Sequence, residues 1–188
     1  MGTGLERKLD YSDYVAIPDD GKRYEIVRGA LYVTPSPSPH HQRISKRLQV
    51  QLMAYFEQRR LGEVFNAPLD VILTDNDIVQ PDLLVVADPD QVSDRGIERA
   101  PLLVIEILSP STASKDREVK MPLYAHYGVA FAWLLDPRAR TLEAYQLEGD
   151  AWQEIGRYSG ADKAAVPPFE AVTLDLDGLW LPIQPQMT

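Results

Sequence analysis

The chain has 188 residues, of which 45% are hydrophobic and 25% charged, a composition typical of one globular domain with a buried core. It contains no cysteine, which excludes disulfides, thiolate metal sites and cysteine nucleophiles, so any bound metal must use oxygen or imidazole ligands. The formal net charge of -9 argues against a nonspecific nucleic-acid coat protein, because polyanion binding normally requires an excess of Lys and Arg.

We expect a single domain over residues 1–188, with a loosely ordered segment at about 1–22 and a core over 23–181. A short helix is expected near Tyr11 to Ala16. No N-terminal apolar run resembles a signal peptide, and no uncharged apolar stretch approaches the ~20 residues of a membrane span. The sequence therefore predicts a cytoplasmic protein without membrane contact.

The first third of the chain combines short β-type runs with one long amphipathic segment. Residues 24–28 and 30–34 flank Gly29 and predict a β-hairpin. A connector rich in Pro and Ser then leads into apolar residues at helical spacing, which predict the first long helix over about His40 to Arg60. Gly62 follows its basic end and is expected to cap this helix.

Basic side chains concentrate on this predicted helix. The basic residues between positions 40 and 60 are Arg43, Lys46, Arg47, Arg59 and Arg60. Glu57 is the single acidic residue in the same range. The helix could face a phosphate backbone, and a solvated surface helix explains the pattern equally well.

From residue 63 onward short strands dominate the pattern. They are expected at residues 64–66, 70–73 and 78–87, with a polar turn at 75–77. A polar loop over 88–99 then precedes Leu102 to Leu108, a nearly continuous apolar run typical of a central strand covered on both faces.

The remainder is expected to contain one more helix and a run of strands. The helix should cover about Ser114 to Tyr127, with a kink at Pro122 and its end at Gly128. The strands are expected at residues 131–135, 141–147, 152–158 and 171–174. Mixed strands with two helices predict an α/β or mixed α+β fold.

Two carboxylates interrupt apolar runs. Glu106 lies within Leu102 to Leu108, where burial requires that a carboxylate be paired, protonated or bound to a metal. A strand-end glutamate that reaches solvent is the alternative, and its six apolar neighbours favour a functional role. Asp82 follows Pro81 at the start of a second apolar run, and on its own such an aspartate is often only a turn residue.

Together these carboxylates predict a metal site. Two hard oxygen ligands at the ends of neighbouring strands can hold one Mg²⁺, with water and a substrate phosphate in the remaining positions. Such an ion polarises a phosphoryl group and acidifies a water molecule. Lys120, on the helix after the Glu106 strand, is the expected cation that stabilises developing charge, and Lys115 is the alternative.

The motifs around these residues resemble a known nuclease superfamily. They are Val79-Gln-Pro-Asp82, Glu106-Ile-Leu-Ser-Pro-Ser-Thr112, Asp116, Lys120, Tyr124, Gly128-Val129, Trp133-Leu-Leu-Asp-Pro137, Tyr24-Glu25 with Gly29, and His41-Gln42. This set, which spans about Tyr11 to Leu181, resembles the PD-(D/E)XK nucleases. More narrowly it is similar to the bacterial family described as putative restriction endonucleases, formerly a domain of unknown function.

The resemblance implies a restriction-endonuclease-like core, a central mixed sheet flanked by helices, with an N-terminal hairpin and extra C-terminal strands. It also implies a Mg²⁺-dependent endonuclease that acts on DNA, with Mn²⁺ as an alternative ion. Asp82, Glu106 and the backbone carbonyl of Ile107 would hold the metal, and Lys120 would assist the attacking water. Relatives of this kind associate as homodimers, which gives a nuclease two opposed sites for two strands.

One position departs from the superfamily pattern, and two further polar residues match it. The pattern has a Lys two residues after the Glu, where this chain has Leu108, and the narrower family implies that Lys120 reaches that spot from the helix. Glu25 is a third acid at the metal site or an exposed hairpin residue. His41 contacts phosphate, transfers a proton, binds metal, or is only a capping or surface residue.

Three classes of function remain open. The first is the metal-dependent endonuclease, and the second is a non-catalytic module that binds nucleic acid or a partner protein on the same scaffold. Hydrolysis of another phosphodiester or ester ranks last, because the chain has no Gly-x-Ser-x-Gly elbow or phosphate loop. No helix-turn-helix or zinc finger is evident, so the sequence predicts no base specificity.

Overall fold

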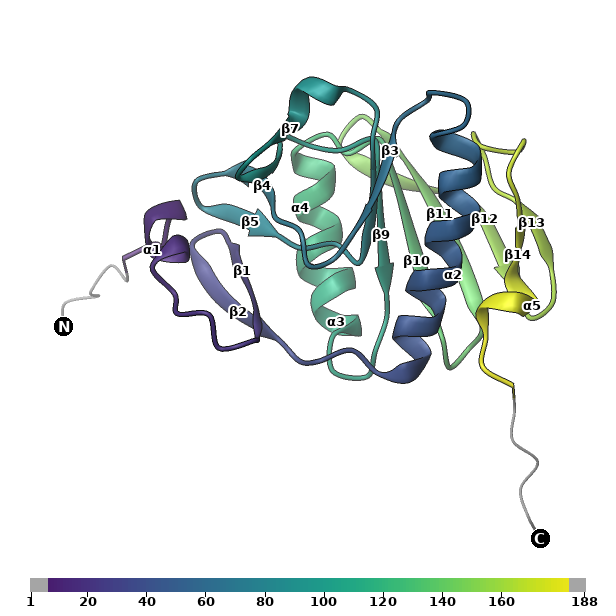
Figure 1. Ribbon diagram of the computed structural model, residues 1–188, viewed down its shortest axis with the longest axis horizontal. Helices are drawn as coiled ribbons and strands as arrows, with labels where there is room; N and C mark the ends of the chain where they lie inside the picture. The colour runs from purple at the N-terminus through teal and green to yellow at the C-terminus, as the bar shows by residue number, and fades with distance from the viewer. Residues whose placement is uncertain (1–6, 183–188) are drawn as a thin grey trace, which may run out of the picture.

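The computed structural model describes residues 7–182 and contains a mixed six-stranded sheet, which we call the central sheet (Figure 1). Its strands are β3 (Glu63–Asn66), β6 (Leu83–Val86), β9 (Leu103–Ile107), β10 (Phe131–Asp136), β11 (Thr141–Glu148) and β12 (Ala151–Ser159). Their order is β12-β11-β10-β9-β6-β3. Strands β9 and β10 are parallel, whereas β6 is antiparallel to β9 and β11 to β10, so the sheet is mixed as predicted.

A second six-stranded sheet, the side sheet, has the order β2-β1-β5-β4-β8-β7. Its strands are β1 (Arg23–Val27), β2 (Ala30–Thr34), β4 (Val71–Thr74), β5 (Asp77–Val79), β7 (Val92–Ser93) and β8 (Gly96–Glu98). The predicted hairpin is confirmed by antiparallel pairing of β1 with β2. Its two turn residues, Arg28 and Gly29, both have positive φ (53° and 81°), as the tight turn that matches strand twist requires.

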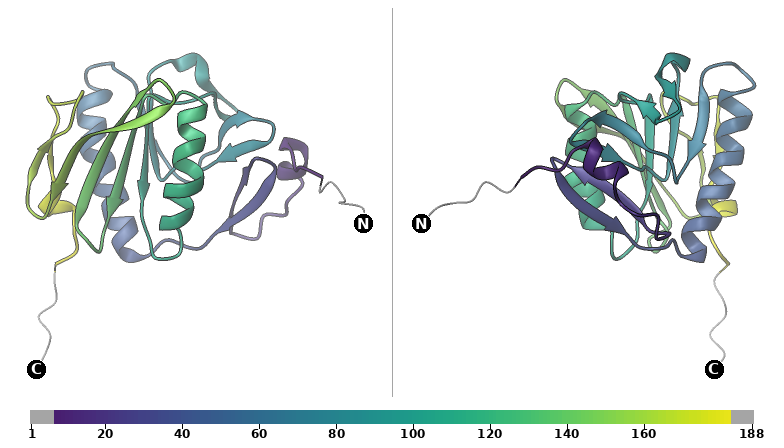
Figure 2. Two further views of the ribbon diagram at one scale, coloured as in Figure 1. Left: turned by 180° about the vertical axis from the view of Figure 1, so that it is seen from behind. Right: turned by 60° about the vertical axis from the view of Figure 1, so that its left-hand side comes forward.

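Helices cover both faces of the central sheet (Figures 1 and 2). The α-helices of the described chain are α1 (Tyr11–Val15), which packs on the side sheet, and α2 (Pro39–Phe56), α3 (Ala113–Lys115), α4 (Met121–His126) and α5 (Leu176–Leu179). On one face α2 packs together with α5 and a small hairpin, β13 (Lys163–Ala165) and β14 (Thr173–Asp175). On the other face lie α4 and the side sheet, so the mixed α/β class is confirmed.

Helix α2 forms because its apolar residues repeat every four positions and give one buried stripe. The stripe consists of Ile44, Leu48, Leu52 and Phe56. The helix ends at Phe56, before the predicted Arg60, and Arg60 itself takes the left-handed conformation at φ 57°. Gly62 is therefore not the cap. A Cβ at Gly62 would lie 2.6 Å from the carbonyl oxygen of Val86, so close packing against β6 explains the glycine.

Two basic residues of α2 bind the C-terminal segment. The Arg43 Nε donates a hydrogen bond to the carbonyl of Trp180 (3.0 Å), and the Arg47 Nη1 donates to that of Gly178 (2.6 Å). Both guanidinium groups thus attach the helix to the chain's last described elements. Of the three basic residues in the middle of α2, only Lys46 lacks such a contact within residues 7–182.

The single strand predicted over 78–87 is wrong. Strand β5 ends at Val79 in the side sheet, and β6 begins at Leu83 in the central sheet. Pro81 lies between them and has no N–H for a sheet ladder, so pairing stops there and the chain passes from one sheet to the other. This crossing places Asp82 at the junction of the two sheets.

Several short elements were not predicted. The expected polar loop over 88–99 contains a 3-10 turn (Pro89–Gln91) and the β7–β8 hairpin. Strand β13 and helix α5 were also missed, and the strand expected at 171–174 is β14. Elements of two to four residues are too short to show a hydrophobic period.

The second long helical segment runs from Ala113 to His126 and contains a π turn over Asp116–Lys120. The Met121 N–H donates to the carbonyl of Asp116, five residues back. Pro122 follows and offers no N–H, so a widened turn accommodates its ring where a regular α-helix would be broken. The predicted irregularity at Pro122 is confirmed, and it takes the form of this π turn.

The start of the described chain is attached to the side sheet. The Leu9 N–H donates to the carbonyl of Gly29 (3.0 Å), and the Tyr14 hydroxyl donates to Asp70 (2.7 Å). The predicted short helix is confirmed as α1, and residues 1–6 of the predicted loose segment lie outside the described residues. Among residues 7–182, no helix has the length and apolar character needed to cross a membrane.

The buried stripe of α2 gives a stability prediction. Leu52 is fully buried, so Leu52→Ala should lower the free energy of unfolding by about 2–5 kcal/mol through lost burial and a cavity. Val50, on the same helix and 63% exposed, is the matched control, and Val50→Ala should change stability by no more than ~0.5 kcal/mol. Urea unfolding measures both, and equal losses would show that α2 does not pack on the sheet as described.

Candidate active site

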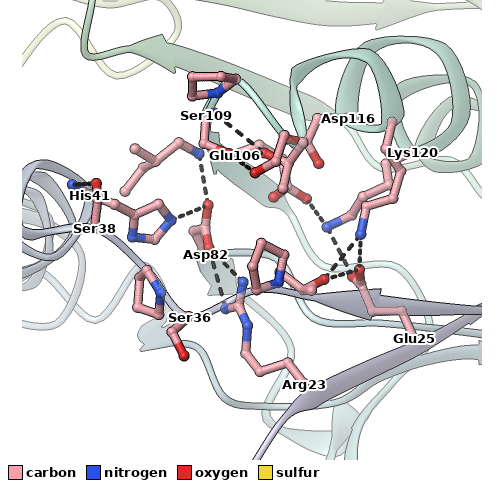
Figure 3. A pocket seen from close by; sticks show the side chains of 18 residues that line it. Arg23, Glu25, Ser36, Ser38, His41, Asp82, Glu106, Ser109, Asp116 and Lys120 are labelled. Carbon is pink, nitrogen blue, oxygen red and sulfur yellow. Dashed lines mark hydrogen bonds and ion pairs between the residues drawn. The ribbon is translucent and has the colours of Figure 1, made fainter.

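A pocket of about 230 Å³ lies where the two sheets, the start of α2 and the loop after β9 meet (Figure 3). Four carboxylates and four basic or imidazole groups line it: Glu25, Asp82, Glu106, Asp116, Arg23, His41, Lys115 and Lys120. All three predicted catalytic residues and both auxiliary ones are therefore in one place.

Glu106 lies near the end of β9 on the face that also carries Val104 and Leu108, because strand side chains alternate. It is 3% exposed. Its Oε1 accepts hydrogen bonds from the Lys120 Nζ at 2.6 Å and the Tyr124 hydroxyl at 2.5 Å. The alternative of a strand-end glutamate in solvent is thus excluded, and the buried charge is compensated by groups of the helical segment.

Lys120 points into the pocket and is 2% exposed. Its Nζ lies 2.6 Å from Glu106 and 3.0 Å from the Oε1 of Glu25. Lys115 also reaches Glu25, with its Nζ 2.6 Å from Oε2. Residues five apart in a regular α-helix point about 140° away from each other. The intervening π turn allows both lysines to face one carboxylate.

Asp82 takes part in a second set of contacts on the opposite side of the pocket (Figure 3). Its Oδ2 accepts hydrogen bonds from the Ile107 N–H at 2.8 Å and pairs with the His41 Nε2 at 2.9 Å. The Arg23 guanidinium lies 3.4 Å from Oδ1. Ser38 caps α2 by accepting from the His41 N–H, which places His41 in the first turn facing Asp82.

The two auxiliary candidates therefore belong to the pocket. Glu25 is 2% exposed, and its Oε1 also accepts from the N–H of Gln80, so the alternative of an exposed hairpin residue is excluded. His41 has a side chain that is 13% exposed and directed at Asp82, so it is not merely a surface residue. The metal-ligand role of the Ile107 carbonyl stays a prediction.

The acids differ in how well their charge is compensated. Burial raises the pKa of Glu106 to about 8, because Lys120 offsets only part of the cost and Asp116 adds repulsion. Burial also raises the pKa of Asp116. Burial alone would raise the pKa of Glu25, but Lys120 and Lys115 outweigh it and lower that pKa to about 2. Positive charge is thus scarce on the Glu106 and Asp116 side of the pocket.

Arg23 and Asp116 were not predicted as site residues. Arg23 stands two positions before Glu25 in β1, so strand alternation puts both on one face and could have revealed it. Asp116 precedes Lys120 by four residues, a spacing typical of an ion pair that stabilises a helix. The structure instead buries Asp116, which is 4% exposed, lines the pocket and forms no ion pair with Lys120 within the described chain.

The donor set fits a hard divalent cation. Across residues 7–182, no three His, Asp or Glu side chains form a ready-made metal cluster. Asp82 and Glu106 nevertheless supply hard oxygen donors at one pocket. The raised pKa of Glu106 indicates that Lys120 offsets only part of the cost of burying its carboxylate, so a further cation would stabilise the ionised form. Mg²⁺ or Mn²⁺ suits such oxygen donors better than a thiolate-seeking metal does.

A family model described as "Putative restriction endonuclease", Uma2, matches residues 11–177. The chain belongs to the Uma2 family. It is 28% identical over 144 residues to an uncharacterized protein of Synechocystis sp., a match that covers 76% of this chain and 75% of the relative. The family supports a nuclease function in general terms.

The fold is also that of a solved structure. The crystal structure of a putative nuclease belonging to DUF820 from Anabaena variabilis matches with a TM-score of 0.74 at 20% identity. The match covers 92% of this chain and 97% of the other. The restriction-endonuclease-like fold is thereby confirmed.

In this Uma2 chain, Leu108 at the usual lysine position is 4% exposed and belongs to the core cluster that contains Tyr124.

The raised pKa of Glu106 gives a pH prediction for the metal-free Uma2 protein. The folded pKa of about 8 exceeds the ordinary 4.5, so the folded state binds more protons than the unfolded state between these values. Stability in EDTA should therefore fall as pH rises from about 4.5 to about 8. Urea midpoints across this range should fall less steeply in Glu106→Gln, with Asp116 responsible for the remainder. Parallel curves for the two proteins would contradict the assignment.

Proposed function

We propose that this chain is a Mg²⁺-dependent endonuclease that hydrolyses phosphodiester bonds in DNA. The observation that carries the proposal is the 2.6 Å contact of Lys120 with Glu106, in a pocket that Asp82 also lines. Membership of the Uma2 family supports the nucleic-acid substrate. A cytoplasmic location and a homodimer that presents two sites to two strands belong to the same proposal.

Asp82, Glu106 and the Ile107 carbonyl would hold the ion. When bound, the ion supplies Lewis-acid polarisation of the scissile phosphate and a more acidic water. Burial of both carboxylates keeps bulk water away from them, which strengthens every charge interaction in the pocket.

The chain's own groups have separate tasks. Lys120, held by Glu25 and Glu106, places an ammonium where an attacking water and a phosphate oxygen can receive its hydrogen bonds. On the Asp82 side, Arg23 and His41 can donate to non-bridging phosphate oxygens. Tyr124 fixes the rotamer of Glu106 through its hydroxyl.

A non-catalytic module explains the pocket less well. A surface for binding alone gains nothing from four buried carboxylates, because burying charge costs several kcal/mol per ion unless a partner compensates it. Strongly shifted pKa values in a pocket are typical of catalytic sites.

The proposal predicts strict metal dependence. Wild-type protein should cleave single-stranded DNA or a supercoiled plasmid with Mg²⁺ or Mn²⁺ and should be inactive in EDTA. Asp82→Asn and Glu106→Gln should reduce cleavage at least ~100-fold while the fold, checked by circular dichroism, is kept. Cleavage that persists in a chelator, or in either variant, would rule the mechanism out.

The two lysines give a matched comparison. Lys120 contacts Glu106, whereas Lys115 contacts Glu25 and Thr34 and forms no ion pair with Glu106 within the described chain. Lys120→Met should therefore lower kcat about 100- to 1000-fold, and Lys115→Met should lower it less than ~10-fold. Single-turnover cleavage rates measure the difference, and a larger loss in Lys115→Met would transfer the proposed role to that residue.

A further inference from the structure

Two larger pockets adjoin the active-site pocket. The Lys46 pocket, about 540 Å³, contains Lys46, Gln49 and Asn66, and shares Arg23, His41 and Asp82 with the active site. The Arg138 pocket, about 820 Å³, contains His40, Arg138 and Arg140, and shares Ser38, Ser109 and Pro110 with it. Each side pocket shares lining residues with the middle one, so the three pockets adjoin, and we call them together the groove.

The groove differs in charge from the rest of the protein. The chain carries 28 acidic and 19 basic residues. Despite this excess, among residues 7–182 no acidic side chain lines the Arg138 pocket, and Asp82 is the only one that lines the Lys46 pocket. Lys46 and Arg138 are exposed, and neither side chain forms an ion pair within residues 7–182. A basic surface on each side of an acidic centre suits a phosphodiester chain whose middle phosphate meets a metal.

The length of the groove suits a short stretch of one strand. Helix α2 follows it from His40 to Gln49, about 14 Å at 1.5 Å per residue. At the ~3.4 Å rise of a stacked, duplex-like strand that distance corresponds to about four nucleotides, and an extended strand would span it with fewer. Both side pockets lie within the range of about 300–1,000 Å³ that is usual for bound small ligands, so each can hold a nucleotide.

The depth of the site favours an unpaired strand. Asp82 is 5% exposed and Glu106 is 3% exposed, beneath the connector over 35–38 and the loop over 109–112. In a duplex, stiff with a persistence length of about 150 base pairs, base pairing fixes each phosphate relative to its neighbours. A single strand can place one phosphate at the bottom and its neighbours in the side pockets.

We propose that this protein binds its substrate as a single strand, with flanking phosphates at Lys46 on one side of the scissile bond and at Arg138 on the other. The strand passes between Ser38 and Ser109 on its way to the Arg138 pocket. This assignment rests on the proposed nuclease function, and it specifies single-stranded or locally unpaired DNA as the substrate.

The test measures binding separately from cleavage. Fluorescence anisotropy of a labelled 12-nucleotide single strand, and of the same sequence as a duplex, is followed with Glu106→Gln protein in EDTA. The single strand should bind at least ~10-fold more tightly than the duplex. In this background Lys46→Ala and Arg138→Ala should each weaken binding about 3- to 10-fold and flatten the salt dependence by about 0.7 of a logarithmic unit.

Arg59→Ala is the matched control. Arg59 lies in the turn just after the same helix and lines none of the three pockets, and its guanidinium lies 4.6 Å from the centre of the Tyr55 ring. Loss of its charge should change binding less than ~2-fold. Equal or tighter duplex binding, or equal losses in all three variants, would overturn the assignment.

Cleavage by wild-type protein in Mg²⁺ separates the two proposals. If the single strand binds with the expected pattern but is not cut, the groove is upheld and the nuclease function fails. If DNA is cut but the binding pattern is absent, the nuclease function is upheld and the groove fails.

Discussion

The rest of the structure depends on the buried ammonium of Lys120. It forms ion pairs with Glu25 of the side sheet and Glu106 of the central sheet, and thereby joins both sheets to the α3–α4 segment. Three ionisable groups with 2–3% exposure are tolerated here only because they contact one another, and removal of Lys120 would leave Glu106 buried without its ion-pair partner. The π turn is part of this arrangement, since it directs Lys115 to the second oxygen of Glu25.

The same arrangement compensates two of the four buried carboxylates better than the other two. Glu25 and Asp82 are stabilised as anions, the first by two lysines and the second chiefly by His41, so the pKa of each is lowered. Glu106 and Asp116 have a raised pKa chiefly because of burial, to which neighbouring carboxylates add repulsion, and Lys120 offsets only part of this cost. A divalent cation at Glu106 would supply the missing charge. Two buried acids whose burial is only partly compensated indicate a site built for function at some expense of stability.

Sequence could reveal the acids but not all of their partners. Glu106 stood out because a carboxylate in a continuous apolar strand needs compensation. The position of Lys120 on the following helix indicated its cation, and the family resemblance supported that role. The separation of β5 from β6 was missed, although Pro81 was its physical cause. The π turn could not be predicted, because hydrophobic spacing does not distinguish it from one turn of α-helix. The contact of both Lys115 and Lys120 with Glu25 depends on this turn, so it could not be predicted either.

The central claim is that Asp82 and Glu106 together hold one divalent cation beside Lys120. Mn²⁺ binding, followed by electron paramagnetic resonance in the absence of DNA, tests it most directly. We expect one Mn²⁺ per chain, with affinity reduced at least ~10-fold in Asp82→Asn and in Glu106→Gln. Glu143→Gln, which removes a buried acid paired with Arg117 and Arg157 outside the pocket, should bind as wild type does. Unchanged Mn²⁺ affinity in both pocket variants would contradict the account.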